Sequence, residues 1–175
     1  MMKRFYRPVC VLLVIVACFP TPAYEASAYS SSNTDLQHRV VGSWKAVSFT
    51  DVPERGETVH PFGTAPNGLM LYTADGCFSI FVMAGPNSSG SKDMNAMSAE
   101  EWRALFHDFL SWFGTYRIDN RQIVLHVDGS SAPAYNGTEQ KRTFRLEQDT
   151  LIFYGDYTKN GIHYRYEHVF RRAHN

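Results

Sequence analysis

The sequence predicts an all-β domain, an eight-stranded antiparallel up-and-down barrel with one amphipathic helix inserted near residues 98–113. Short segments rich in β-branched and aromatic residues recur at fairly regular spacing, with turn signals between them, which is typical of barrels and sandwiches. Only one segment has a convincing helical period, whereas a parallel α/β fold needs several helices as crossovers. A sandwich is the alternative arrangement of the same strands.

The first 28 residues have the features of a signal peptide. A basic stretch precedes an apolar run at residues 9–19, which is too short to span a bilayer comfortably, and Ala26-Ser27-Ala28 is a small-x-small cleavage site. Residues 29–39 are rich in Ser, Asn and Thr and are predicted to be a disordered lead-in to a domain at residues 40–173. Residues 15–18 also match a bacterial lipobox, so a lipid anchor at Cys18 is the alternative to a soluble exported protein.

The charge of the chain argues against nucleic acid as a partner, and its cysteine content argues against an intrachain disulfide in the predicted mature domain. Without residues 1–28 the chain has 14 basic and 16 acidic residues, a net charge of −2. No run of Lys or Arg remains, so we predict no nucleic-acid partner. Cys10, and Cys18 if cleavage follows Ala28, leave with the signal peptide. Cys77 then has no partner for an intrachain disulfide and is expected to be a small buried hydrophobe.

The strongest local signal is a hairpin at residues 68–83. Two apolar runs flank Asp75-Gly76, and both residues tolerate the positive φ that a type I′ turn requires. Both faces of the two strands carry apolar residues, whereas a sheet with one wet face alternates apolar with polar residues. We therefore expect one face to meet a packed core and the other to face a covering element or a cavity.

The remaining elements are predicted from their period and their turns. Residues 40–49 form the first strand, and residues 51–66 form a polar connection punctuated by Pro and Gly. A capping box from Ser98 to Glu101 begins the helix, whose apolar residues continue at helical spacing as far as Phe113. We expect this helix to plug or cover the barrel. Further strands are expected at residues 114–119, 122–128, 138–147, 150–155 and 162–172, with turns at residues 119–121, 148–149 and 159–161.

Several motifs occur in the same order as in a known family. They are Val41-Gly42-Ser43-Trp44, Pro61-Phe62-Gly63 with the segment 68–76, the segment 114–119, the segment 137–142, and Phe170-Arg171-Arg172. With them the chain resembles, over residues 40–172, the bacterial and fungal lipocalin-like domain family. The resemblance implies an eight-stranded barrel of the lipocalin or calycin type. It also implies structural roles for Gly42 and Trp44, and a cation–π contact in which Arg171 or Arg172 packs on Trp44.

Metal and cofactor sites have little support in the sequence. Its seven His residues are scattered, and none forms an i, i+4 helical pair or a His-x-His strand pair. His126 is the best candidate for a haem ligand, although a hydrogen-bonded histidine is the more frequent explanation. There is no Gly-x-Ser-x-Gly motif and no Gly-rich phosphate loop. We predict no metal site and no cofactor.

Polar side chains of inward parity mark a candidate binding site. Gln140 and Arg142 share parity with the apolar Phe144, so an amide and a guanidinium are expected inside the barrel, where they need partners. The partner is either a ligand carbonyl or carboxylate, or an acidic side chain such as Glu139 or Glu167. The candidate ligand-binding residues are Tyr72, Phe81, Met83, Trp112, Tyr116, His126, Gln140, Arg142 and Phe144.

These features favour an exported, non-catalytic barrel that binds a small hydrophobic or amphipathic molecule. The second hypothesis is a cyclase or isomerase for a polyketide-like or terpenoid substrate. In it, Gln140 and Arg142 stabilise negative charge, and Tyr116 or His126 moves a proton. The third is an envelope interaction module that contacts the membrane through a lipidated Cys18.

Overall fold

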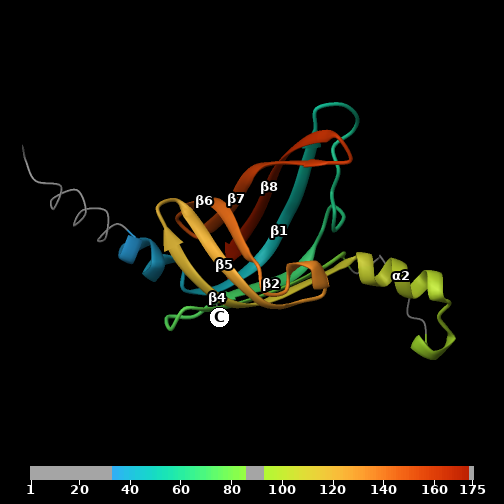
Figure 1. The fold of residues 1–175 in the computed structure, drawn as a ribbon, viewed down its shortest axis with the longest axis horizontal. Coiled ribbons are helices and arrows are strands. Elements are labelled where there is room, and N and C mark those ends of the chain that lie inside the picture. The colour runs from blue at the N-terminus through green and yellow to red at the C-terminus, as the bar shows by residue number, and fades with distance from the viewer. Residues whose placement is uncertain (1–32, 86–92, 174–175) are drawn as a thin grey trace, which may run out of the picture.

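The structure is a computed structural model that describes residues 33–85 and 93–173. Eight antiparallel strands form a closed barrel in which each strand pairs with its sequence neighbours and the last pairs with the first (Figure 1). This confirms the predicted fold class. The strands are β1 (Gly42–Pro53), β2 (Asn67–Tyr72), β3 (Cys77–Met83), β4 (Phe109–Asp119), β5 (Gln122–Ser130), β6 (Glu139–Glu147), β7 (Thr150–Lys159) and β8 (Ile162–Arg172). The helix α2 (Ala99–His107) lies between β3 and β4, and 3-10 turns occur at Met94–Ala96 and Pro133–Tyr135.

Tight turns join the later strands at the predicted positions. The two-residue turns after β4, β6 and β7 each contain a residue of positive φ, namely Asn120, Gln148 and Asn160. The hairpin between β2 and β3 differs from the prediction. Its loop is Thr73-Ala74-Asp75-Gly76, and only Gly76 in it has a positive φ, of 88°. Asp75 is therefore part of a four-residue connection and not of a type I′ turn.

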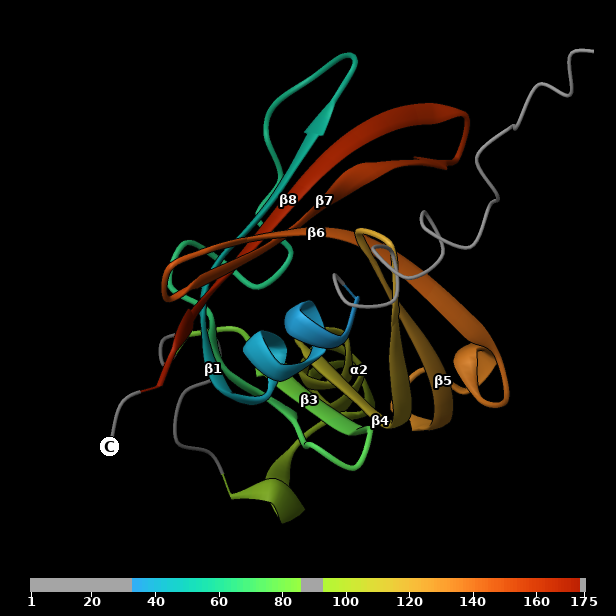
Figure 2. The ribbon, with the colours of Figure 1, turned by 90° about the vertical axis from the view of Figure 1, so that its left-hand side faces the viewer.

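A helix over residues 33–40 covers one end of the barrel (Figure 2). Val40 is completely buried, and Leu36 packs against the core. The predicted lead-in at residues 29–39 is thus helical in its described part and not disordered. Short helices are marginal alone in water, so the apolar contacts of these two residues with the barrel are what stabilise this one.

Trp44 and Arg172 close the same end of the barrel. Trp44 is completely buried, and its Nε1 donates a hydrogen bond of 2.8 Å to the Val40 carbonyl. The Arg172 guanidinium lies 4.1 Å from the centre of the Trp44 ring and donates to the Val41 carbonyl at 2.9 Å. The cation–π contact implied by the family resemblance is therefore present, and Arg172 makes it. Arg171 is exposed on the outer face.

The helix α2 is shorter than predicted and lies outside the barrel. The capping box from Ser98 to Glu101 forms as predicted, but the helix ends at His107, and Trp112 belongs to β4. None of its residues is buried: Trp102 is 42% exposed and Phe106 61%. Figure 1 shows the helix extending away from the strands, so the expectation that it plugs or covers the barrel was wrong. Among residues 33–85 and 93–173, no helix combines the length and the apolar character that a membrane span needs.

Strand alternation divides the β2–β3 hairpin into a buried and an exposed face. Met70 and Tyr72 face inward on β2, and Phe78 and Val82 face inward on β3. Successive side chains of a strand point to opposite faces, so the residues between them must face outward. The exposed residues on this outer face include Leu69, Leu71, Cys77, Phe81 and Met83. The predictions that Cys77 is buried and that Phe81 and Met83 line the interior were therefore wrong.

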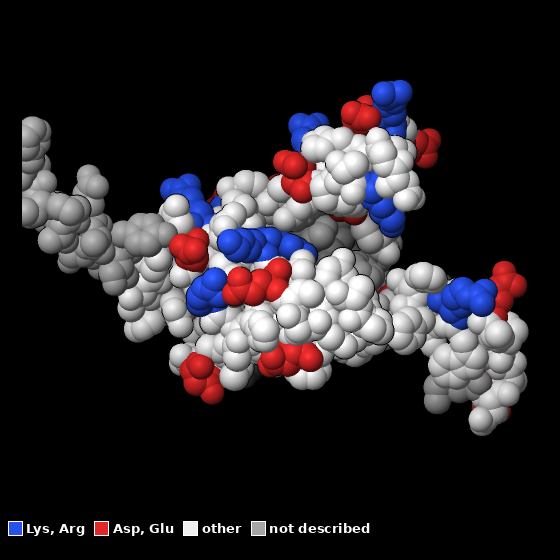
Figure 3. Space-filling view, viewed as in Figure 1, with Lys and Arg blue, Asp and Glu red and all other residues white. Residues whose placement is uncertain are grey.

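Charged residues on the outside of the barrel pair with one another. Arg117 donates to Glu139 at 2.7 Å, and Arg145 donates to Glu167 at 2.8 Å. Figure 3 shows acidic and basic side chains next to each other on the face in view. Glu139 and Glu167 therefore bind arginines on the outer face. They are not the partners of Gln140 and Arg142 that the sequence suggested as one possibility.

Candidate functional site

A cavity of about 250 Å³ lies inside the barrel and forms the candidate site. Most of its lining is apolar, including Phe49, Met70, Phe78, Leu125, Phe153 and Phe170. Pro61 and Tyr135 also line it and are exposed, so the cavity opens to solvent beside the loop after β1 and the 3-10 turn Pro133–Tyr135. In Figure 1 these elements lie at the end away from the helix over residues 33–40. The volume suits one small molecule.

Arg142 on β6 is the arginine of this lining. Its guanidinium lies 5.5 Å from the centre of the Trp112 ring, and it donates to Gln140 Oε1 at 3.3 Å and to the Lys141 carbonyl at 3.0 Å. No carboxylate among the described residues forms an ion pair with it. Strand parity thus predicted the inward position of Gln140 and Arg142 correctly, and it is Arg142 that reaches the cavity.

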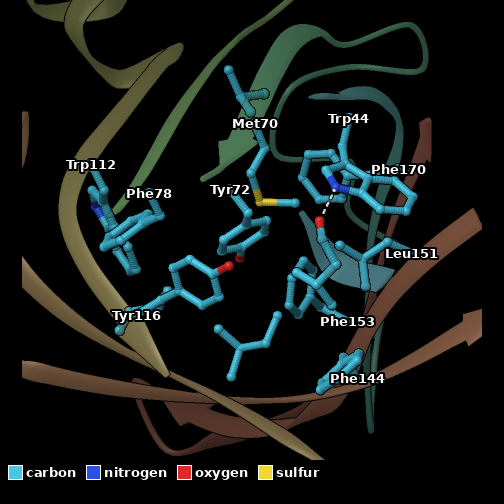
Figure 4. Close-up of a cluster of buried hydrophobic side chains, with 14 of the residues drawn as sticks. Trp44, Met70, Tyr72, Phe78, Trp112, Tyr116, Phe144, Leu151, Phe153 and Phe170 are labelled. Atoms are coloured by element: carbon cyan, nitrogen blue, oxygen red, sulfur yellow. Dashed lines mark hydrogen bonds between the residues drawn. The ribbon is translucent and has the colours of Figure 1, made fainter. Parts of the chain in front are cut away.

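Two buried donors beside the cavity lack a partner. The Tyr72 hydroxyl and Trp112 Nε1 are the buried side-chain polar atoms that bind nothing in the part of the chain that the structure describes. Both residues line the cavity, and Figure 4 shows Tyr72 in the middle of the cluster, with Trp112 and Phe78 to one side. Burial raises the pKa of the Tyr72 hydroxyl well above its usual range, so it stays protonated and can only donate or accept as a neutral group.

A second polar group in the lining consists of Asp51, His168 and Tyr157, and we call it the Asp51 site. Asp51, on β1, is 6% exposed, and both Asp51 and His168 line the cavity. The Tyr157 hydroxyl donates to Asp51 Oδ2 at 2.8 Å, and His168 Nε2 lies 3.3 Å from Asp51 Oδ1. Burial and the hydrogen bond to Asp51 raise the pKa of the Tyr157 hydroxyl, so it remains a donor.

Sequence reasoning missed the Asp51 site because it ended the first strand at Phe49. The strand continues to Pro53 and pairs with β8, where Asp51 lies opposite Tyr166. Asp51 therefore shares the inward parity of Phe49. A polar residue two positions after a core aromatic residue was the available signal, but the adjacent Pro and Gly residues favoured a loop.

Two groups of the predicted ligand-binding residues face inward. Tyr72, Trp112 and Arg142 line the cavity. Phe144 and Tyr116 belong to the core cluster, and Gln140 is half-buried and bound to Arg142.

His126, together with the already described Phe81 and Met83, faces outward. Leu125 and Val127 are buried on β5, so His126 between them must face outward, where its Nε2 lies 3.5 Å from Asp128 Oδ1. The prediction of an inward His126 was wrong. In the described part of the chain, no three His, Cys, Asp or Glu side chains gather in a way that could hold a metal ion.

Comparison with known proteins gives the family. Two of the solved structures that match are the wild-type fluorescent protein UnaG and a mutant of it, each 10% identical to this chain and covering 78% of it. The match covers 98% of the wild-type chain with a TM-score of 0.34, and 97% of the mutant chain with a TM-score of 0.35. No curated protein matches the sequence. A family model described as "Lipocalin-like domain" matches residues 41–166, which is most of the chain, and the chain therefore belongs to the lipocalin-like domain family.

Proposed function

We propose that the protein binds a small, mainly apolar molecule in the barrel cavity and holds a carbonyl or carboxylate group of it at Arg142. The observation that carries this proposal is a largely apolar cavity lined by an arginine without a carboxylate partner among the described residues. A guanidinium has five N–H donors, and Arg142 uses two of them within the chain. The others are available for a charge-assisted hydrogen bond to a ligand oxygen.

The unpaired donors beside the cavity support the same proposal. An unsatisfied buried donor costs about 1–3 kcal/mol. The Tyr72 hydroxyl and Trp112 Nε1 both carry this cost. Each atom is covered by neighbouring side chains, so a ligand oxygen reaches it only after a small movement of the lining. The hydrogen bonds that such a ligand then forms remove the cost of the unpaired donors and so favour its binding.

We propose binding and not catalysis, because the residues suggested for proton transfer cannot serve a substrate in the cavity. His126 lies on the outer face, beside Asp128. The Tyr116 hydroxyl donates to the Thr73 carbonyl at 2.9 Å, and burial raises its pKa above the usual value. The cyclase hypothesis therefore loses both of the proton carriers that the sequence had suggested.

Two experiments test the binding proposal. Native mass spectrometry of the protein purified from its own host should show a bound molecule, which can be extracted and identified. Calorimetry should then compare para-toluate, which has a carboxylate, with para-xylene, which has none. Arg142→Met should weaken para-toluate binding about tenfold or more, since a hydrogen bond to a charged group contributes about 1.5–3 kcal/mol. Arg145→Met, on the outer face of the same strand, is the matched control and should have no effect. A protein that leaves its host empty and binds neither probe contradicts the proposal.

We also propose that the barrel is exported. The proposal is supported by the basic, apolar and small-residue pattern of residues 1–28, which lie outside the described residues, as does Cys18. Intact-mass measurement of the protein from its host distinguishes the possibilities. A chain that begins at Tyr29 supports a soluble exported protein, and a diacylated N-terminal Cys18 supports the lipid-anchored alternative. A chain that retains Met1 overturns export.

A further inference from the structure

We propose that the Asp51 site binds an ammonium or hydroxyl group of the same ligand. The inference rests on the proposed function and narrows the ligand class. The ligand is then a small molecule with a hydrogen-bond acceptor at one end, a hydrogen-bond donor at the other, and an apolar part between them. Arg142 binds the first end and the Asp51 site binds the second.

The first step of the argument is the position of Asp51. It is the buried charged residue in the described part of the chain, and its surroundings include Phe49 two positions earlier on β1. Its backbone N–H donates to the Val59 carbonyl at 2.9 Å, and its carbonyl accepts from the Val59 N–H at 2.8 Å. These two bonds hold the backbone that carries the Asp51 side chain in place. A buried carboxylate is unfavourable unless it is paired or hydrogen-bonded. A position of this kind, on the wall of a cavity, needs donors.

The second step is the hydrogen-bonding capacity that Asp51 has left. A carboxylate offers about four lone-pair directions on its two oxygens. Tyr157 uses one on Oδ2 and His168 faces one on Oδ1. The remaining directions on the two oxygens are unused by side chains of the described residues. Because Asp51 lines the cavity, a donor that enters the cavity can use them.

The third step is the orientation of His168. Its ring contacts those of Phe49 and Tyr166, whose centroids lie 4.5 and 4.9 Å from its own. Nε2 is the ring nitrogen that faces the carboxylate, and a His168 tautomer with its proton on Nε2 has Nδ1 left as an acceptor. The His168 side chain is 27% exposed, so a ligand can reach it. A carboxylate and an imidazole acceptor side by side favour a group with several N–H or O–H donors, and an ammonium ion offers three.

The fourth step is the charge of the two sites. Arg142 and Asp51 line one cavity of about 250 Å³ and carry opposite charges. Both charges also act on one hydroxyl: burial raises the pKa of Tyr166, Arg142 opposes this rise, and Asp156 and Asp51 add to it. A molecule whose two ends have opposite hydrogen-bonding character therefore matches the cavity better than one with a single polar end.

Three probes of nearly equal size test the inference: para-toluate, para-(hydroxymethyl)benzoate and para-(aminomethyl)benzoate. They share the carboxylate and the ring and differ only in the group at the far end. Calorimetry with the protein purified from its host should show the aminomethyl compound binding about tenfold more tightly than para-toluate, with the hydroxymethyl compound between them. Asp51→Asn should remove this preference, so that the three probes bind the variant with nearly equal affinity. Asp156→Asn, the same change on an exposed residue of β7, should preserve it.

The outcomes separate the two proposals. Equal affinity of the three probes for the unaltered protein, or loss of the preference in Asp156→Asn as well, overturns the role of the Asp51 site. Binding of para-toluate that depends on Arg142 still supports the proposed function in that case. No binding of any probe overturns the role of the Asp51 site, and together with a protein that leaves its host empty it overturns the proposed function as well. If circular dichroism shows that Asp51→Asn does not fold, His168→Gln takes its place, and an unchanged preference in that variant contradicts the inference.

Discussion

Replacing Arg172 with Met should destabilise the barrel by about 3 kcal/mol. The guanidinium lies 4.1 Å from the centre of the Trp44 ring, and a contact of this kind contributes about 0.5–2 kcal/mol. It also donates to the carbonyls of Val41 and Arg39, at 2.9 and 2.6 Å. Water can replace the bond at the exposed Arg39, so we count one charged hydrogen bond, worth about 1.5–3 kcal/mol. The carboxylate of Asp149, 3.5 Å from Nε and half-exposed, adds about 0–1 kcal/mol.

Urea unfolding followed by tryptophan fluorescence measures this loss. With a slope of about 2 kcal/mol per molar for a domain of this size, a loss of 3 kcal/mol lowers the midpoint by about 1.5 M. Arg171→Met is the matched control, because Arg171 is the preceding residue of the same strand and is exposed, so its replacement should cost less than about 0.5 kcal/mol. Equal losses in the two variants, or a loss below about 1 kcal/mol for Arg172→Met, would refute the estimate for the contact with Trp44.

Three further predictions concern other parts of the molecule. Gly42→Ala should cost about 1–3 kcal/mol, because Gly42 has a φ of 131° and a Cβ there would lie 2.7 Å from Arg172 Nη1; an unchanged urea midpoint contradicts this. Phe106→Ser should change the unfolding free energy by less than about 0.5 kcal/mol, because α2 leaves this ring 61% exposed; a larger loss in the same assay would mean that the helix packs on the barrel. Stability should fall as the pH rises above about 10, where tyrosine ionises in the unfolded chain while burial keeps Tyr72 protonated in the folded one. The decline should be shallower in Tyr72→Phe, and identical pH profiles of the two proteins in urea unfolding would exclude Tyr72 as its source.

The strands could be predicted because each has a local signal, whereas the end of the helix has none. Asn120 and Asn160 occupy turn positions that require positive φ, and both were found where the sequence placed them. The apolar residues after His107 fit both patterns: Phe109, Leu110 and Phe113 continue the helical stripe, whereas Leu110 and Trp112 lie on one face of a strand. Pairing of β4 with β3 and β5 decides between them, and such pairing involves residues far apart in the sequence. Tertiary contacts therefore override the helical pattern from Phe109 onward.

The candidate site could be predicted only where one strand showed its own parity. On β6, Phe144 identifies the inward face, so Arg142 was assigned correctly. On β3 both faces are apolar, so nothing local showed that Phe81 faces outward. The pairing of Asp51 with His168 joins the first and last strands across 117 residues. A contact of that sequence separation follows from barrel closure, which no local pattern encodes.

The two ends of the barrel differ in how their polar groups are satisfied, and this difference is the strongest physical argument for a ligand. At the closed end, Trp44 Nε1 and the Arg172 guanidinium both bind backbone carbonyls. At the cavity, the Tyr72 hydroxyl and Trp112 Nε1 bind nothing among the described residues, and Arg142 has no carboxylate partner there. Unpaired donors reduce the stability of the empty fold, whereas phenylalanine in place of Tyr72 would not incur this cost. A ligand that pairs them should stabilise the folded state by an amount that rises with the logarithm of its concentration and is about 2.7 kcal/mol at a hundred times its dissociation constant.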